Sequence, residues 1–248
     1  MRHQVAAGTF ALALLPCLVV CACASGREAR IEEVLRRSRS APERVAELES
    51  GYLSDPDRDV RALAVWAIGD AAAPGATPIL APLVSDPDPV VRRATVVAIC
   101  RSGGEGADQT LLALANDTDG AVRKAAVRCF AGTRSRPAGA LARALHDRNR
   151  EVRAVALAAL AARPEPDAGG ALVDVLRAGA PDERIAAAGA LKALGDPSSL
   201  PALEEVAATS LPMGVREAVE SAILFLREAA AATAATAAET SKPQDPSR

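Results

Sequence analysis

The sequence predicts an all-α fold, a right-handed α-solenoid of about six two-helix units, on three observations. First, a Val-Arg dipeptide recurs along the 248-residue chain, and a fixed period of 20 to 50 residues is typical of stacked repeats. Second, alanine dominates while only one Trp, one Tyr and three Phe occur, which favours closely packed helices. Third, long runs that alternate β-branched and polar residues are missing, which argues against an all-β fold.

The first element, residues 1–23, is predicted to be a targeting segment. Arg2 and His3 precede an apolar run over residues 5–20, the order of charged and apolar regions in a secretory signal. This run is shorter than the ~20 residues that a membrane-spanning helix needs. We therefore expect an exported protein.

The end of this apolar run resembles the lipobox of bacterial lipoprotein signals, in the sequence Val20-Cys21-Ala22-Cys23. The resemblance implies that Cys23 is lipidated, and that the protein is a lipoprotein of the cell envelope, anchored to a membrane and facing the periplasm. The alternative is an ordinary cleavage site at Ala22-Cys23-Ala24, which would release a secreted, soluble protein beginning at Ser25.

The repeats fill most of the remaining chain. Residues 24–53 are predicted to form a tether and a degenerate N-terminal capping repeat, and residues 54–228 the solenoid. The arginines that mark the repeats follow one another at intervals of 31, 31, 30, 31 and 32 residues: Arg61, Arg92, Arg123, Arg153, Arg184 and Arg216. Counting each of these arginines as position 0, apolar or small residues recur at −1, +3, +6 and +7, which is one stripe of a helix.

Each of these helices is followed by turn residues and a second, shorter apolar segment, so a unit consists of helix A, a turn and helix B. Asp or Asn residues precede helix A, where their side chains can cap free N–H groups. Residues 229–248 turn Ala/Thr-rich and then polar, and we expect a disordered tail there.

The pattern of Asp at −6, Val at −1 and Arg at 0, as in Asp86 to Arg92, resembles HEAT-repeat proteins of the bacterial PBS lyase HEAT-like type, with an armadillo-like helical fold. The resemblance implies a structural ladder of Asp and Arg along the stack. By the pattern, each Asp pairs with the Arg of its own unit: Asp55 with Arg61, Asp86 with Arg92, Asp117 with Arg123, and Asp147 with Arg153. Ala178 and Ser210 replace the Asp in the last two units, so the ladder should fade there.

Composition and motifs argue against nucleic-acid binding, metal binding and catalysis. The formal net charge of −2 argues against nucleic-acid binding. Only two histidines occur, so no multi-histidine metal site is expected, and we predict no cofactor and no catalytic residues. Cys129 fills a small buried position, and Cys100 lies two positions out of step with it, so we expect no disulfide there.

One apolar column lies opposite the buried stripe, at position +5. Leu35, Trp66 and Val97 occupy this column in successive units, and an exposed apolar strip of this kind suits partner docking. Together these features predict a non-enzymatic protein-protein interaction scaffold, with an unknown protein partner on the helix-B surface. The alternative is an accessory or cryptic enzyme of the HEAT-like lyase type, for which Arg143, Asp174, Glu204 and Glu205 are the charged candidates on the helix-B segments.

Overall fold

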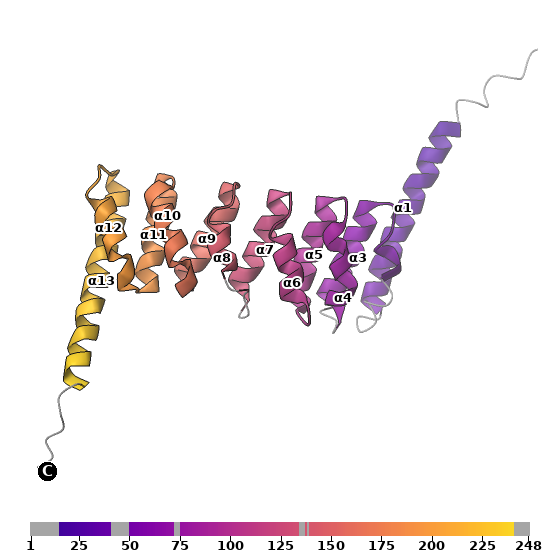
Figure 1. The fold of residues 1–248 in the computed structure, drawn as a ribbon. Helices are drawn as coiled ribbons and strands as arrows, with labels where there is room; N and C mark the ends of the chain where they lie inside the picture. Colours follow the sequence, from indigo (N-terminus) through magenta and orange to yellow (C-terminus); the bar gives the residue numbers. More distant parts are fainter. Residues whose placement is uncertain (1–14, 41–49, 72–74, 134–136, 138, 241–248) are drawn as a thin grey trace, which may run out of the picture. The chain divides into compact units, whose positions relative to one another are not determined.

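The computed structural model describes residues 15–40, 50–71, 75–133, 137 and 139–240, and these residues form α- and 3₁₀-helices joined by short turns. The expected α-solenoid is confirmed. The chain divides into two compact units, residues 1–114 and 115–248, which are described in turn. Figure 1 labels their helices.

In the first unit, the helices α1 (Leu15–Ser40), α3 (Arg58–Asp70) and α5 (Pro89–Ser102) are the A helices, and α3 packs against both α1 and α5. The B segments are α4 (Ala76–Leu80), continued by the 3₁₀-helix η3 (Ala81–Ser85), and α6 (Ala107–Leu114). A 3₁₀-turn, η2 (Ser50–Tyr52), precedes α3.

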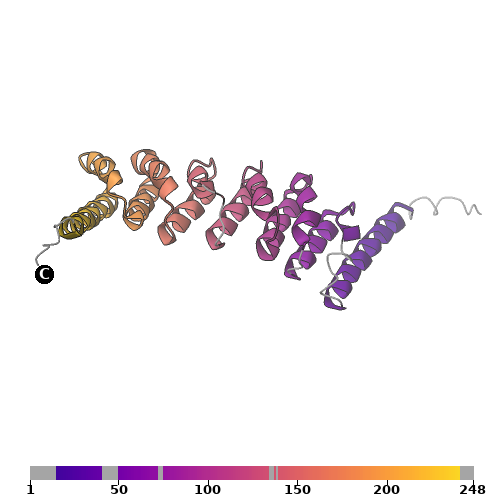
Figure 2. The ribbon, with the colours of Figure 1, turned by 60° about the horizontal axis from the view of Figure 1, so that its bottom comes forward.

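In the second unit, the A helices are α7 (Gly120–Gly132), α9 (Arg150–Ala162), α11 (Pro181–Leu194) and α13 (Met213–Thr240), each packed against the next. The B helices α8 (Ala140–Ala144), α10 (Gly169–Ala178) and α12 (Leu200–Ala207) form the other layer. Two 3₁₀-turns, η4 (Pro166–Ala168) and η5 (Pro197–Ser199), lead into α10 and α12. In Figure 2 the orange and yellow helices of this unit lie in two rows.

The predicted stripe forms the core of both units. All the valines at −1 and all the residues at +3 are buried, and at +7 only Ile223 is partly exposed. Position +4 is buried as well, by Val65, Val96, Val127, Leu157 and Ala188, so the apolar face of the A helices is wider than the sequence pattern suggested.

Small residues allow the A helices to approach closely. Gly69 lies within α3, and a Cβ added there would come 2.5 Å from the backbone of Ala98 in α5. Because Cβ atoms do not approach backbone atoms so closely, glycine is needed at this crossing.

Two end elements differ from the predicted domains. Residues 1–14 of the targeting segment lie outside the described residues, whereas α1 already begins at Leu15. At the other end, α13 continues to Thr240, so the expected disorder from residue 229 is wrong for residues 229–240; alanine is the strongest helix former, and this stretch is rich in it. Residues 241–248 lie outside the described residues. Within the described chain the Arg216 unit consists of α13 alone, so five units have both helices.

Candidate interaction surfaces

The Arg61 side chain is the best-defined rung of the ladder in the first unit. Its Nε and Nη2 donate to the Asp86 carboxylate at 2.8 and 2.9 Å, and its Nη1 donates to the backbone carbonyl of Asp55 at 2.7 Å. Arg61 therefore joins the turn before its own helix to the turn before the next one. Only 12% of the Arg61 side chain and 4% of the Asp86 side chain are exposed, so water competes little with this pair.

The same geometry recurs in the second unit. Arg123 donates from Nε and Nη2 to Asp147 at 2.7 and 2.8 Å, and from Nη1 to the Asp117 carbonyl at 2.8 Å. Arg153 donates to the Asp147 carbonyl at 2.8 Å, and its carboxylate partner is Glu183, at 2.9 Å from Nε.

These contacts correct the predicted pairing. Arginine contacts the backbone carbonyl of the Asp in its own unit, as Arg92 does with Asp86, but its carboxylate partner belongs to the following unit. Each Asp carboxylate also accepts an N–H two residues ahead, which helps to orient it, as Asp55 does from Asp57 at 2.8 Å. The remaining oxygen faces the preceding unit, where Arg30 lies 2.8 Å from Asp55.

The ladder of arginine–carboxylate pairs continues one unit further than predicted, because Arg153 pairs with Glu183 of the next unit. Glu183 occupies position −1, where the other units have Val, and it is buried. Its second carboxylate oxygen accepts the N–H of Ala180 at 3.2 Å, so this Glu replaces both functions of the missing Asp. The exception of a Glu at an otherwise apolar position of the repeat was the sequence signal for this role, which the pattern of Asp and Arg alone did not predict.

The predicted helix caps are confirmed. Asp57, Asp88, Asp119 and Asn149 each accept a backbone N–H from the first turn of the A helix that follows. At Asp147 the hydrogen bond from Arg123 lowers the pKa of the carboxyl, against the opposing effect of burial. This ladder carboxylate therefore stays ionised well below neutral pH.

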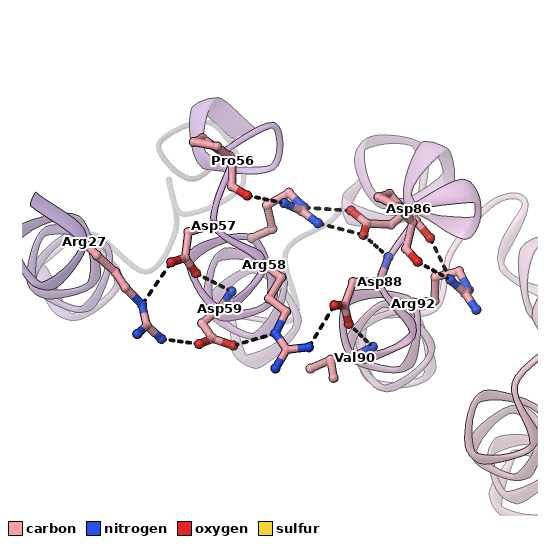
Figure 3. Close-up of polar contacts among 11 residues, drawn as sticks. Arg27, Pro56, Asp57, Arg58, Asp59, Asp86, Asp88, Val90 and Arg92 are labelled. Atoms are coloured by element: carbon pink, nitrogen blue, oxygen red, sulfur yellow. Dashed lines mark hydrogen bonds and ion pairs between the residues drawn. The ribbon is translucent and has the colours of Figure 1, made fainter. Parts of the chain in front are cut away.

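A second, outer row of ion pairs runs beside the ladder in the first unit (Figure 3). Arg27 pairs with Asp57 at 3.0 Å and with Asp59, and Arg58 pairs with Asp88 at 3.0 Å. The N–H of Val90 and, second, the Arg58 side chain lower the pKa of Asp88. Sequence reasoning missed this row, although Arg27 and Arg58 both stand three residues before a ladder arginine.

The column Leu35, Trp66 and Val97 is less open than expected. Trp66 is 40% exposed, whereas Leu35 and Val97 are half-buried. The guanidinium of Arg101 lies 5.7 Å from the centre of the Trp66 ring and pairs with Asp70, so a cation–π contact covers part of the ring.

The helix-B layer of the second unit presents exposed charged side chains. Arg177 of α10 pairs with Glu205 of α12 at 2.6 Å, and Arg227 of α13 pairs with Glu204 at 2.7 Å. Asp174 lies 3.9 Å from Nε2 of His146, an ion pair only when the imidazole is protonated. Two of the three carboxylates suggested for the enzyme alternative are thus each bound to an arginine.

The cysteines differ from expectation. Cys100 and Cys129 are both disulfide-bonded, so the prediction that they stay reduced is wrong. A helical position predicts burial, but it does not give the distance to a partner sulfur, which decides whether a disulfide forms. Cys23 lies on α1, and its side chain lies outside the part of the chain that the structure describes.

The described residues contain neither a metal-binding cluster nor a membrane-spanning helix. They contain no group of three or more His, Cys, Asp or Glu side chains arranged to hold a metal ion. None of their helices has the length and hydrophobicity needed to cross a membrane.

Comparison with known proteins gives one family. The model of HEAT repeats matches residues 45–131 and 137–223, while no curated protein matches significantly. The X-ray structure of YibA from E. coli is similar with a TM-score of 0.53 and 24% identity, covering 75% of this chain and 69% of that one. An engineered protein is similar with a TM-score of 0.51 and 22% identity, covering 74% of this chain and 97% of that one.

Proposed function

Because this chain belongs to the HEAT-repeat family, we propose that it is a non-enzymatic scaffold that binds a partner protein on its helix-B layer. The observation that carries the proposal is the unequal use of the two layers. Both layers bury apolar residues, but the caps and the ladder pairs lie at the A helices and the turns before them. The B helices of the second unit present exposed charged side chains instead, such as Asp174, Arg177 and Glu205.

We further propose that the protein is exported and held at an envelope membrane by a lipid on Cys23. The charged and apolar regions before Cys23 support export. The disulfide-bonded state of Cys100 and Cys129 supports it too, since disulfides persist in oxidising compartments such as the periplasm.

The anchor is tested by expressing the full chain in bacteria with an alkyne fatty acid and measuring the mass of the mature N-terminus. A chain that begins at Cys23 and carries the label is expected. Cys23→Ala should lose the label, and Cys21→Ala, the matched control in the same segment, should keep it. An unlabelled chain that begins at Ser25 would establish the alternative cleavage and reject the anchor.

The scaffold function is tested by affinity purification of the full-length protein from detergent-solubilised membranes. One or a few proteins should copurify in fixed proportion with the wild-type bait. Trp66→Ala tests the apolar column on the A layer, and an unchanged yield would exclude that column as the docking site. If no protein copurifies, and none is recovered after chemical crosslinking in whole cells, the scaffold proposal fails.

The enzyme alternative needs titratable groups that converge on one pocket. Glu204 and Glu205 are bound to Arg227 and Arg177, which leaves Asp174 as the candidate carboxylate of that set without an arginine partner among the described contacts. This arrangement favours a binding surface over a catalytic centre.

A further inference from the structure

A groove between α10 and α12 lies on the helix-B layer of the second unit. Its volume is about 620 Å³, and it opens to solvent along one side. It is lined by the turn η4, one face of α10 from Gly169 to Arg177, the end of α11, the turn η5 and the start of α12. All these elements belong to one compact unit, so a single body forms the groove.

The lining of the groove combines polar and apolar side chains with two glycines. Val173, Leu194 and Pro201 contribute the apolar surface. Gly169 lies against Leu194, 3.5 Å from where its Cβ would be, whereas a Cβ on Gly170 would meet nothing within 4 Å. The surface over Gly170 is therefore open enough for the main chain of a ligand to lie on it.

The charge of the lining is negative. Asp174 and Asp196 line the groove together with one cation, Arg177, and that cation is already paired with Glu205 at 2.6 Å. Asp196 accepts both the hydroxyl (2.6 Å) and the N–H (2.9 Å) of Ser198, which lower the pKa of its carboxyl and keep it ionised. The groove thus presents two carboxylates beside its apolar side chains.

We propose that this groove binds an extended, lysine- or arginine-rich segment of the partner protein. The inference rests on the proposed scaffold function and names the partner's chemistry. An extended chain fits an open groove with accessible backbone, and its cationic side chains can reach the carboxylates of Asp174 and Asp196. Nucleic acid does not fit, because its phosphates would face the same two carboxylates.

The first test fills the groove with a bulky side chain. The probe is a fluorescent octalysine peptide, and its binding to the full-length protein is followed by anisotropy, with octaglutamate as the control peptide. Gly170→Phe should weaken octalysine binding on the order of tenfold, because the ring occupies the space above α10. The matched control is Gly189→Phe in α11, an exposed helical glycine that also has nothing within 4 Å of its Cβ position and does not line the groove.

The second test reverses one charge. Asp174→Lys should weaken octalysine binding by about fivefold, the range expected of an exposed ion pair, and should do so less at high salt. Glu217→Lys makes the same charge change on an exposed position of α13 outside the groove and should have little effect. Helical circular dichroism of each variant checks that the fold is retained.

The outcomes separate the groove from the scaffold function. Octalysine binding that Gly170→Phe and Asp174→Lys leave unchanged overturns the proposed groove, and so does equal binding of octaglutamate. If the same partner copurifies with the wild type and with Gly170→Phe, the scaffold function stands and its binding site lies elsewhere. If the partner is lost with Gly170→Phe and retained with Gly189→Phe, both proposals are supported.

Discussion

At the scale of single residues, the ladder arginine gives each repeat its link to the next. Arg123 satisfies a backbone carbonyl of its own turn and both oxygens of a carboxylate on the next turn. Both side chains are nearly buried, at 7% exposure for Arg123 and 11% for Asp147. A charge removed from such a pair leaves its partner desolvated and without compensation, which is costly.

We therefore expect Asp147→Asn to lower the free energy of unfolding by about 3 kcal/mol. The comparison is Glu151→Ala, which removes the partner of Lys124 from a surface pair whose carboxylate is 69% exposed. That change should cost less than ~1 kcal/mol. Urea denaturation of both variants measures the difference, and equal losses would show that the ladder is no stronger than a surface ion pair.

The Asp147 carboxylate should make the stability of the folded protein depend on pH. Its pKa is lower in the folded chain than in the unfolded chain, because Arg123 stabilises the charged form, so folding favours the deprotonated state. The stabilisation is fully present above the unfolded pKa of about 3.9 and is lost as the pH falls through the lower, folded pKa. The stability gap between wild type and Asp147→Asn should thus shrink between neutral pH and about pH 3, and a constant gap would contradict this cause.

The two disulfide-bonded cysteines make a direct chemical prediction. When the purified full-length protein is denatured without reductant and treated with iodoacetamide, peptides that contain Cys100 and Cys129 should remain unmodified. Prior reduction should expose both to alkylation. Mass spectrometry that finds both residues alkylated without reductant would show free thiols in the native protein, and would remove this support for export.

At the scale of elements, the sequence predicted the A helices well because their burial follows a helical period. The residues at −1 and +3 determine which face is buried, and that face is buried in every unit. The carboxylate partners were not predictable in the same way, because a sequence pattern shows which residues share a unit and not which side chains meet across units. Asp196 and the start of α10 in the groove carry no repeated pattern, so sequence alone did not point to them.

Substitutions of Glu183 provide a test, because the repeat pattern and the observed contacts predict opposite changes in stability at this position. The repeat pattern favours Val at this position, so a consensus argument predicts that Glu183→Val stabilises α11. The contacts predict a loss of about 2 kcal/mol, since Arg153 loses its carboxylate and Ala180 loses an N–H acceptor.

Glu183→Gln serves as the control at this site, because the amide keeps an acceptor oxygen and loses the charge. Its thermal midpoint should fall between those of the wild type and Glu183→Val. A higher midpoint for Glu183→Val than for the wild type would mean that apolar burial outweighs the ion pair here.

The A helix of the Arg216 unit, α13, differs from the A helices before it at position +4. Position +4 carries a buried apolar residue in the five preceding A helices, but in α13 it carries Glu220, which is exposed. Leu224, 61% exposed, is an apolar exception on α13.

At the scale of the whole molecule, the residues that recur in every repeat and the exposed side chains of the B helices follow different rules. The recurring Val, Arg and Asp residues maintain the packing of each unit, so they vary little from repeat to repeat. The exposed side chains of the B helices follow no such rule, and they differ between α8, α10 and α12. A partner that contacts these differing side chains would bind one particular part of the chain and not every repeat.

Site-specific photocrosslinking in whole cells tests the proposed binding layer most directly. A photoreactive residue is placed on exposed positions of the B helices, Ala113 in α6 and Gly170 in α10, and on exposed positions of the A helices, Arg128 in α7 and Gly189 in α11. One and the same partner protein should be crosslinked from B-helix positions and not from A-helix positions. Crosslinks to a partner from the A-helix positions alone, or from none of the four, would contradict binding on the helix-B layer.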